Sequence, residues 1–310
     1  MKRVLGGILV GLGAFLLAAG LVAYFWAPDL LLKTPEAVDN TTYLTGDATK
    51  LNLSTGKQDE LPIKVTSVTL TDTRRSTDTV NAWVNNVCVV VDEGNPPDCI
   101  DKKDDRLVQA STDIFATDRV TGESVDDPAT YLSGLDYTAT TGLVNKFPFG
   151  TEKKDYMFWD PTLGAAVPVT YEGTVDLDGL EVYEFHMVID GATIEIAKGV
   201  EGTYDFDKTM MIEPTTGAIV DQSQHDVRTL EDGTNALDMQ IQFTDDIVAE
   251  GVSDAKENLS GIKLVTETVP LVGVIGGPLL IIAGVFLLVR SRRKPEPADD
   301  APAPKTPATV

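Results

Sequence analysis

Histidine and cysteine are nearly absent from the sequence, with two of each in 310 residues, and no compact catalytic signature is present. There is no Gly-x-Ser-x-Gly nucleophile elbow, no Walker loop, no His-Glu-x-x-His zinc helix and no dinucleotide-binding glycine fingerprint. Neither His186 nor His225 has the spacing of a metal ligand relative to the cysteines. We therefore expect a protein that is not an enzyme and that has no cofactor and no metal site. A hydrolase that uses two of the many carboxylates is the open alternative.

Charged residues are missing from two long runs, Val4–Trp26 and Val269–Val289. About 20 apolar residues in a helix cross a hydrocarbon core of roughly 30 Å, so each run predicts a transmembrane helix. Lys2 and Arg3 precede the first run, and a basic cluster at 290–294 follows the second, which places both termini in the cytoplasm. Residues 27–268 are then extracytoplasmic. A cleaved signal peptide is the alternative for the first run, although a signal usually has only roughly 7 to 15 apolar residues.

Basic residues are scarce in the predicted extracytoplasmic segment. The chain has 25 basic and 48 acidic residues; seven and three of these lie outside residues 27–268, which leaves 18 and 45 and a net charge of −27. A field of this sign opposes nucleic acid as a partner and favours cations and solubility. The Pro- and Ala-rich residues 290–310 predict a disordered cytoplasmic tail, and residues 1–3 form the cytoplasmic start.

Runs of alternating apolar and polar residues, rich in Val, Ile and Thr, recur along the extracytoplasmic segment and predict strands. The runs are 63–70, 79–91, 107–115, 166–171, 180–189, 192–197, 203–212, 218–230 and 236–243. Turn residues separate many of them, and the pairs Asp178-Gly179, Asp190-Gly191 and Asp232-Gly233 each indicate a hairpin. We therefore predict a mainly β fold with one large antiparallel domain, in the form of a meander, a barrel or a sandwich.

One amphipathic helix is predicted at the end of the extracytoplasmic segment. Thr244 can act as an N-cap, and Asp245 and Asp246 suit the positive start of a helix. Apolar residues follow at helical spacing. Because Gly261 weakens the pattern, we expect the helix to end near that residue and residues 262–267 to be extended.

The two cysteines flank a short turn. Cys88 is followed by the apolar residues Val89–Val91, and the turn sequence Gly94-Asn-Pro-Pro97 lies shortly before Cys99. Such a turn can bring the two thiols together across the base of a loop, and disulfides persist in exported domains. We therefore predict a disulfide between Cys88 and Cys99. Two free thiols are the alternative.

Aromatic residues are few overall but gather in one stretch that also contains a basic doublet. The stretch comprises Phe147, Phe149, Lys153, Lys154, Tyr156, Phe158 and Trp159. One interpretation is a ligand site for an amphiphile, with the rings against an acyl chain and the lysines on a phosphate head group. The other interpretation is that the rings anchor a long strand in the core.

Several motifs between the two apolar runs resemble those of a known family. They are Phe147-Pro-Phe149, Lys153-Lys154, Tyr156-x-Phe158-Trp159-Asp160, Tyr171-Glu-Gly173 and Gly179-Leu-x-Val-Tyr183-x-Phe185. With the two terminal spans, they are similar to the actinobacterial porin PorA-like membrane proteins, formerly a family of unknown function. The resemblance covers nearly the whole chain except the tail. It implies an envelope protein of bacteria with mycolic acids, and the family name implies a pore.

Two functions remain open from the sequence. The leading hypothesis is a membrane-anchored binding or scaffold protein that assists lipid, glycolipid or lipoglycan transport or assembly, with other envelope proteins as partners. The alternative is a channel. Gly7-x3-Gly11 and Gly273-x3-Gly277 would permit close helix packing within one chain or between copies in a homo-oligomer.

Overall fold

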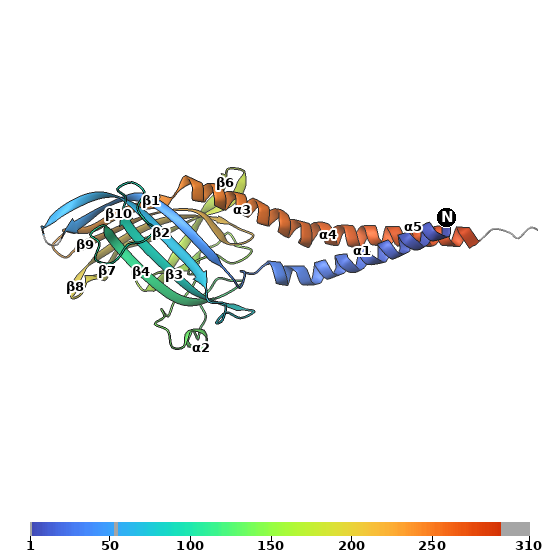
Figure 1. Cartoon of the computed structure of the whole chain (residues 1–310), viewed down its shortest axis with the longest axis horizontal. Helices are drawn as coiled ribbons and strands as arrows, with labels where there is room; N and C mark the ends of the chain where they lie inside the picture. Colours follow the sequence, from blue (N-terminus) through green and yellow to red (C-terminus); the bar gives the residue numbers. More distant parts are fainter. Residues whose placement is uncertain (1, 53–54, 293–310) are drawn as a thin grey trace, which may run out of the picture. The chain divides into compact units, whose positions relative to one another are not determined.

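The computed structural model describes residues 2–52 and 55–292, and the chain divides into two compact units. One unit comprises the chain up to Leu31 together with the chain from Gly261 onward, and the other comprises Leu32–Ser260. Figure 1 shows the elements of both units. The predicted disordered tail lies outside the described residues from residue 293 onward.

The second apolar run belongs to a long helical segment. Its parts follow one another directly as α3 (Asp245–Lys263), η1 (Leu264–Thr268), α4 (Val269–Leu271), η2 (Val272–Gly276) and α5 (Gly277–Arg292), and η1 and η2 are π-helical turns. The prediction of an extended segment at residues 262–267 is therefore wrong. A glycine costs only about 1 kcal/mol relative to alanine inside a helix, which is too little to end one that leads into an apolar span.

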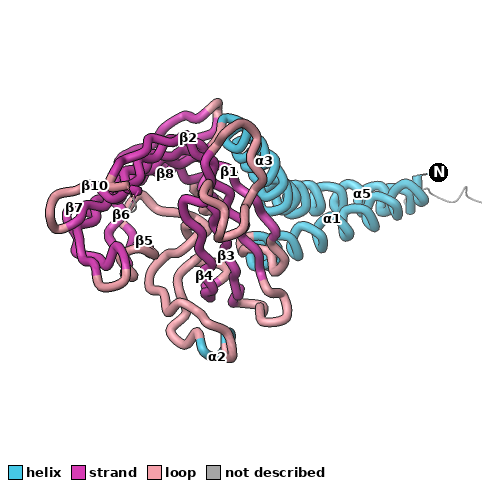
Figure 2. The backbone as a smooth tube through the Cα atoms, turned by 60° about the vertical axis from the view of Figure 1, so that its left-hand side comes forward, coloured by secondary structure: helices cyan, strands magenta, loops and turns pink. Residues whose placement is uncertain are grey.

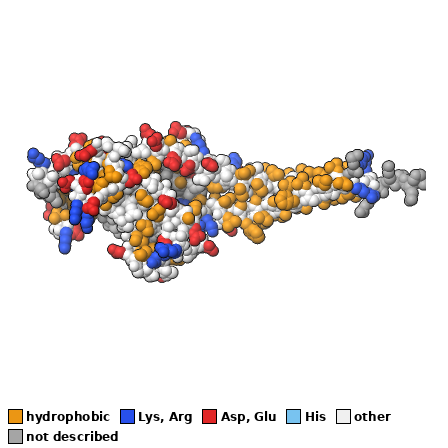
Figure 3. Space-filling view, viewed as in Figure 1, with side chains coloured by type: hydrophobic (Ala, Val, Ile, Leu, Met, Phe, Trp, Pro, Cys, Tyr) orange, Lys and Arg blue, Asp and Glu red, His pale blue; other side chains and the backbone are white. Residues whose placement is uncertain are grey.

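The helical unit is a close pair formed by α1 (Lys2–Leu31) and the α4–α5 segment. A Cβ atom on Gly13 would lie 2.6 Å from the carbonyl oxygen of Gly277, and one on Gly20 would lie 2.7 Å from the Cα of Gly273. Gly273-x3-Gly277 thus packs within the chain, whereas Gly7 and Gly11 have no neighbouring atom within 4 Å of such a position. Apolar side chains cover this unit (Figure 3), and the two long apolar helices suggest membrane anchoring.

The second unit is built on a curled antiparallel sheet of ten strands, as predicted (Figures 1 and 2). The strands are β1 (Asp39–Asn52), β2 (Lys57–Thr71), β3 (Val80–Val91), β4 (Leu107–Asp118), β5 (Tyr156–Asp160), β6 (Ala165–Leu177), β7 (Leu180–Ala197), β8 (Val200–Glu213), β9 (Ala218–Leu230) and β10 (Asn235–Phe243). Their order in the sheet is β4-β3-β2-β1-β10-β9-β8-β7-β6-β5. The meander predicted after Tyr171 is confirmed as the β6 to β10 half of this order.

Two strands differ from the sequence pattern. The polar, Thr-rich stretch that forms β1 was not predicted as a strand, yet it pairs with β2 and β10 and joins the two halves of the sheet. The predicted hairpin at Asp190-Gly191 is wrong, because β7 runs through it with a bulge between Ile189 and Ala192. Gly191 has a φ of +62°, and its N–H donates to Asp205 Oδ1 at 2.7 Å. The bulge therefore takes the place of a turn.

One row of directly paired residues crosses nine of the ten strands. In order from β5 to β3 the row reads Tyr156, Val169, Met187, Lys208, Gln224, Ile241, Gly46, Ile63 and Val91. Directly opposed residues of an antiparallel sheet project from the same face. We call the face that carries this row the inner face, and the two largest core clusters lie on it.

The opposite face of the sheet is partly covered by α3. Val252 and Ala255 of that helix pack against Leu180, Val182 and Val220 of β7 and β9. All five side chains are buried, so the apolar stripe of the helix meets a matching apolar patch of the sheet. The predicted amphipathic helix is therefore confirmed.

A long crossover at residues 119–155 connects the two edge strands, β4 and β5 (Figure 2), and it contains the short helix α2 (Ala129–Leu132). Leu143 lies beside β5, where its N–H donates to Met157 O at 2.8 Å and its carbonyl accepts from Trp159 N at 2.7 Å. Isolated bridges join Thr117 to Ser124 and Glu123 to Leu143. Through these residues the crossover makes backbone contacts with both edge strands, β4 and β5.

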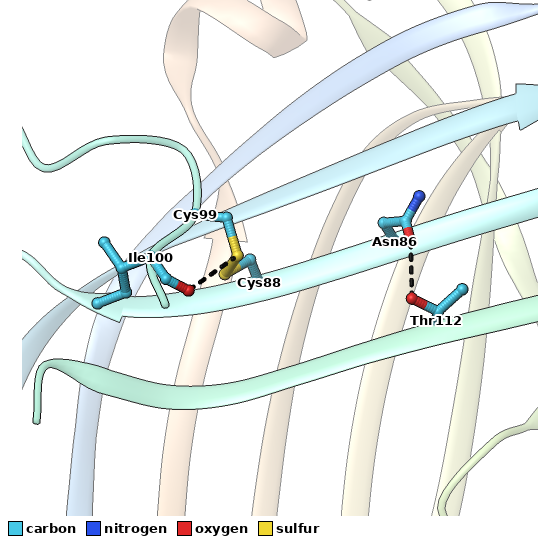
Figure 4. The surroundings of a disulfide bond; sticks show 5 residues. All are labelled: Asn86, Cys88, Cys99, Ile100 and Thr112. Atoms are coloured by element: carbon cyan, nitrogen blue, oxygen red, sulfur yellow. Dashed lines mark hydrogen bonds between the residues drawn. A yellow bond between two sulfur atoms is a disulfide. The ribbon is translucent and has the colours of Figure 1, made fainter. Parts of the chain in front are cut away.

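The predicted disulfide is confirmed. Cys88 of β3 is bonded to Cys99, with a Cα–Cα distance of 5.5 Å (Figure 4). Because β4 begins only at Leu107, Cys99 lies in a loop and not in a returning strand. Asp98 of the same loop accepts a hydrogen bond from Lys64 Nζ of β2 at 2.8 Å, so the loop is held against the sheet at two points.

Candidate functional site

The aromatic stretch singled out in the sequence contributes to the larger core cluster of the inner face. The rings of Phe147 and Phe158 are buried, and their centroids lie 5.7 Å apart. Phe147 also lies 4.6 Å from the ring of Phe185 and 5.5 Å from the ring of Tyr156. The structure thus brings three residues of the predicted ligand site together, within a packed core.

The other residues of the stretch lie at the margin of that core. The Nζ atoms of Lys153 and Lys154 lie 5.0 Å from the ring of Tyr183 and 5.4 Å from the ring of Tyr156. Both lysines are exposed, while Phe149 and Trp159 are half-buried. The ring of Phe149 packs under Lys146, whose Nζ lies 3.7 Å from the ring centroid. Whether this margin binds an amphiphile stays a prediction.

A buried polar cluster that the sequence did not predict lies on the same face. Asp226 is only 3 % exposed, although its directly paired neighbours Phe206 and Met239 are apolar. The guanidinium of Arg228 holds this carboxylate through two hydrogen bonds, from Nε to Oδ1 at 3.0 Å and from Nη2 to Oδ2 at 2.6 Å. Burial raises the pKa of Asp226, and the hydrogen bonds from Arg228 oppose that shift.

Asp160 and Tyr204 form the second part of this inner-face cluster. The Tyr204 hydroxyl donates to Asp160 Oδ2 at 3.1 Å, and the N–H of Leu163 donates to Oδ1 at 2.6 Å. Asp160 is 3 % exposed and Tyr204 is 1 % exposed. Burial, and then the negative charges of Asp160 and Asp226, raise the pKa of Tyr204, so its hydroxyl remains a donor at neutral pH.

Lys208 is the fifth member of the cluster. It projects from β8 between Met187 of β7 and Gln224 of β9. Burial lowers the pKa of Lys208 to about 8, and the charge of Asp160 partly offsets this shift. The Nζ atom lies 5.5 Å from the centroid of the Phe158 ring. The cluster therefore combines two carboxylates, two cations and one phenol on a largely apolar face.

This arrangement can bind or orient a polar group. Both histidines pair with acids elsewhere: His186 Nε2 lies 3.0 Å from Asp207 Oδ1, and His225 Nε2 lies 2.7 Å from Asp238 Oδ1. Within residues 2–52 and 55–292, no group of three or more His, Cys, Asp or Glu side chains could hold a metal ion.

A weak sequence signal for the cluster was available. Asp226 and Arg228 are two residues apart in one strand, so they share a face, and Phe206 and Tyr204 share a face of the adjacent strand. Asp160, in contrast, directly precedes Pro161, and an Asp-Pro pair is typical of a turn. Nothing in the local sequence indicates that its side chain reaches β8.

The chain is similar to proteins described as Porin PorA. The family model described as Porin PorA matches residues 5–286 of the chain. A Porin PorA of Corynebacterium amycolatum is 26 % identical over 299 residues, which covers 72 % of this chain and 77 % of that protein. A Porin PorA of Corynebacterium resistens is 22 % identical over 284 residues and covers 60 % and 68 % of the two chains.

Proposed function

The chain belongs to the porin PorA family, and from this premise we propose that it is a pore-forming protein of the cell envelope. The observation that carries the proposal is the extent of the family match, which includes both apolar helices and the entire sheet. The name of the two corynebacterial relatives supports it. The proposal assigns no catalytic step to the chain.

We propose a two-pass topology with both termini in the cytoplasm and the sheet unit outside. The basic residues Lys2 and Arg3 at one end and Arg290 at the other support this orientation, because basic flanks are retained on the cytoplasmic side. The bond between Cys88 and Cys99 also supports it, because disulfides persist in oxidising compartments outside the cytoplasm.

The conducting pathway, in this proposal, forms between several copies of the chain. The helices of one chain approach so closely at Gly13 and Gly277 that a single Cβ atom does not fit, which leaves no room for an aqueous path between them. Gly7 and Gly11 have open space beside them and could pack against another copy. The partner implied by the pore is therefore a second copy of this chain within the bilayer.

The charge of the sheet unit supports selectivity for cations. With a net charge of −27 over residues 27–268, the chain raises the local concentration of cations around it. Vesicles loaded with potassium test the proposal: purified full-length chain should release the ion, and release should rise more steeply than linearly with protein concentration. Vesicles that retain potassium at every protein concentration would contradict it.

A second candidate function has a specific observation in its favour. The sheet unit is a compact body with its own core clusters, which suits a membrane-anchored binding or scaffold protein that assists lipid, glycolipid or lipoglycan transport or assembly. Native mass spectrometry of the chain extracted from its own membrane, combined with crosslinking, tests this function. Neither a bound lipid nor a crosslinked envelope protein would then be found if the chain serves only as a pore.

A further inference from the structure

Lys208 differs from the other members of the inner-face cluster because no described residue accepts a hydrogen bond from it. Asp226 and Arg228 hold each other, and Asp160 accepts from Tyr204 and Leu163. The Lys208 Nζ atom lies 5.5 Å from the centroid of the Phe158 ring and interacts with the charge of Asp160, but it makes no ion pair within 4.0 Å. Three N–H donors are thus left without an acceptor in the described part of the chain.

The ammonium group is nevertheless within reach of solvent. Side-chain N and O atoms that are fully buried and unpaired occur, among the described residues, in Thr66, Asn81, Asn145 and Asn235, and Lys208 Nζ is not one of them. An acceptor oxygen that arrives from solvent can therefore reach it, and a charge-assisted hydrogen bond to an ammonium is stronger than one between neutral groups. The position therefore favours a ligand that brings its own acceptor oxygens.

The residues around Lys208 on the inner face include a second hydrogen-bond donor. On the same face, Phe206 and Met210 lie two residues away along β8, and Met187 lies opposite on β7. All three are buried members of the larger core cluster. Gln224 lies opposite on β9, and its side-chain amide also makes no hydrogen bond to a described residue. Two neighbouring donors, an ammonium and an amide, therefore lie side by side on the inner face.

We propose that Lys208 and Gln224 form a binding site for an oxyanion, a phosphate or a carboxylate group, on the inner face of the sheet. The oxygens of such a group accept from both donors, and charge-assisted hydrogen bonds to an anion are the strong ones. Met187, Phe206 and Met210 are buried around this position, so the oxyanion, and not an attached alkyl chain, is the group that the two donors recognise. The site does not depend on whether the chain conducts ions.

Calorimetric titration of the full-length chain in a neutral detergent tests the site with two probes, inorganic phosphate and dodecyl phosphate. We expect dodecyl phosphate to bind, and Lys208→Met to weaken binding at least tenfold while the melting temperature stays within a few degrees. Lys198→Met is the matched control, because Lys198 is exposed in the turn between β7 and β8, and it should leave the affinity unchanged.

The two probes also separate the possible sources of the anion. Binding of both phosphates, lost in Lys208→Met, indicates a site for the oxyanion itself. Binding of dodecyl phosphate alone, lost in the same variant, indicates the head group of an amphiphile. If neither probe binds, or if Lys208→Met and wild type bind equally, the proposal is overturned. Potassium release measured in parallel distinguishes this failure from failure of the proposed pore.

Discussion

Arg228 donates two hydrogen bonds, of 2.6 and 3.0 Å, to the carboxylate of Asp226. The residues paired with Asp226 on the two adjacent strands are both apolar. The acid is buried and its partner is half-buried, with side-chain exposures of 5 % for Asp226 and 18 % for Arg228. A buried ion pair of this kind is weak support for stability, because desolvation offsets much of the attraction. The contribution of the ion pair to the stability of the sheet unit depends on both partners being present.

Arg228→Met should therefore destabilise the sheet unit by about 3 to 5 kcal/mol, because it leaves a buried carboxylate without its partner. The double variant Asp226→Leu/Arg228→Met removes both charges and should recover most of that loss. Denaturant unfolding of the two variants and the wild type gives the free energies. If the double variant is as unstable as the single one, the loss comes from packing and the account of this pair fails.

Stability should depend on pH through Lys146. This lysine donates to Thr34 Oγ1 at 3.0 Å, and burial lowers its pKa to about 7, with the charge of Asp118 opposing the shift. The unfolded chain, with a lysine pKa of about 10.4, binds more protons than the folded chain above pH 7. The free energy of unfolding should therefore rise between pH 7 and pH 9.5.

Melting curves of the full-length chain at those two pH values test this expectation. Lys146→Met, which removes the titrating group and keeps an apolar side chain, should reduce the rise. Part of the rise should remain, because the pKa of Lys208 is also lowered, to about 8. An unchanged pH dependence in Lys146→Met would show that the lysine titrates normally in the folded protein.

The helix pair offers a prediction with an internal control. Gly13→Ala should weaken the packing of α1 on α5, because its Cβ would lie 2.6 Å from a backbone oxygen of Gly277. Gly11 lies two residues earlier in α1, and a Cβ atom there would have no neighbour within 4 Å, so Gly11→Ala should not change the stability of the monomer. Unfolding of the helical circular dichroism signal in increasing sodium dodecyl sulfate compares the two. Equal sensitivity of both variants would contradict the observed helix face.

The disulfide should stabilise the sheet unit through the loop that it closes. The two cysteines are 11 residues apart, and in the chain-entropy description a loop of that size corresponds to about 3 kcal/mol. The double variant Cys88→Ser/Cys99→Ser should unfold at correspondingly lower denaturant concentration than the wild type. As a control, a maleimide should label neither cysteine of the wild type before reduction.

The sequence alone was sufficient for local features and insufficient for the inner face. Alternation and Asp-Gly turns predicted most strands, and charge-free runs predicted the apolar helices, because these signals are local. The Thr-rich β1 lacks clear apolar alternation, so only its β-branched residues indicate a strand, and Gly191 makes a bulge where the Asp-Gly pair predicts a turn. Which side of each strand faces inward depends on long-range register, so the meeting of Asp160 with Tyr204 was beyond local patterns.

Pore formation and its cation selectivity can be tested together by the reversal potential across a planar bilayer that separates two potassium chloride concentrations. With purified full-length chain in the bilayer, the proposed pore predicts stepwise conductance and a reversal potential displaced toward the equilibrium value for potassium, because the acidic unit favours cations. A bilayer that stays silent at every protein concentration would contradict pore formation. Conductance with a reversal potential near the chloride value would contradict the role assigned to the acidic unit.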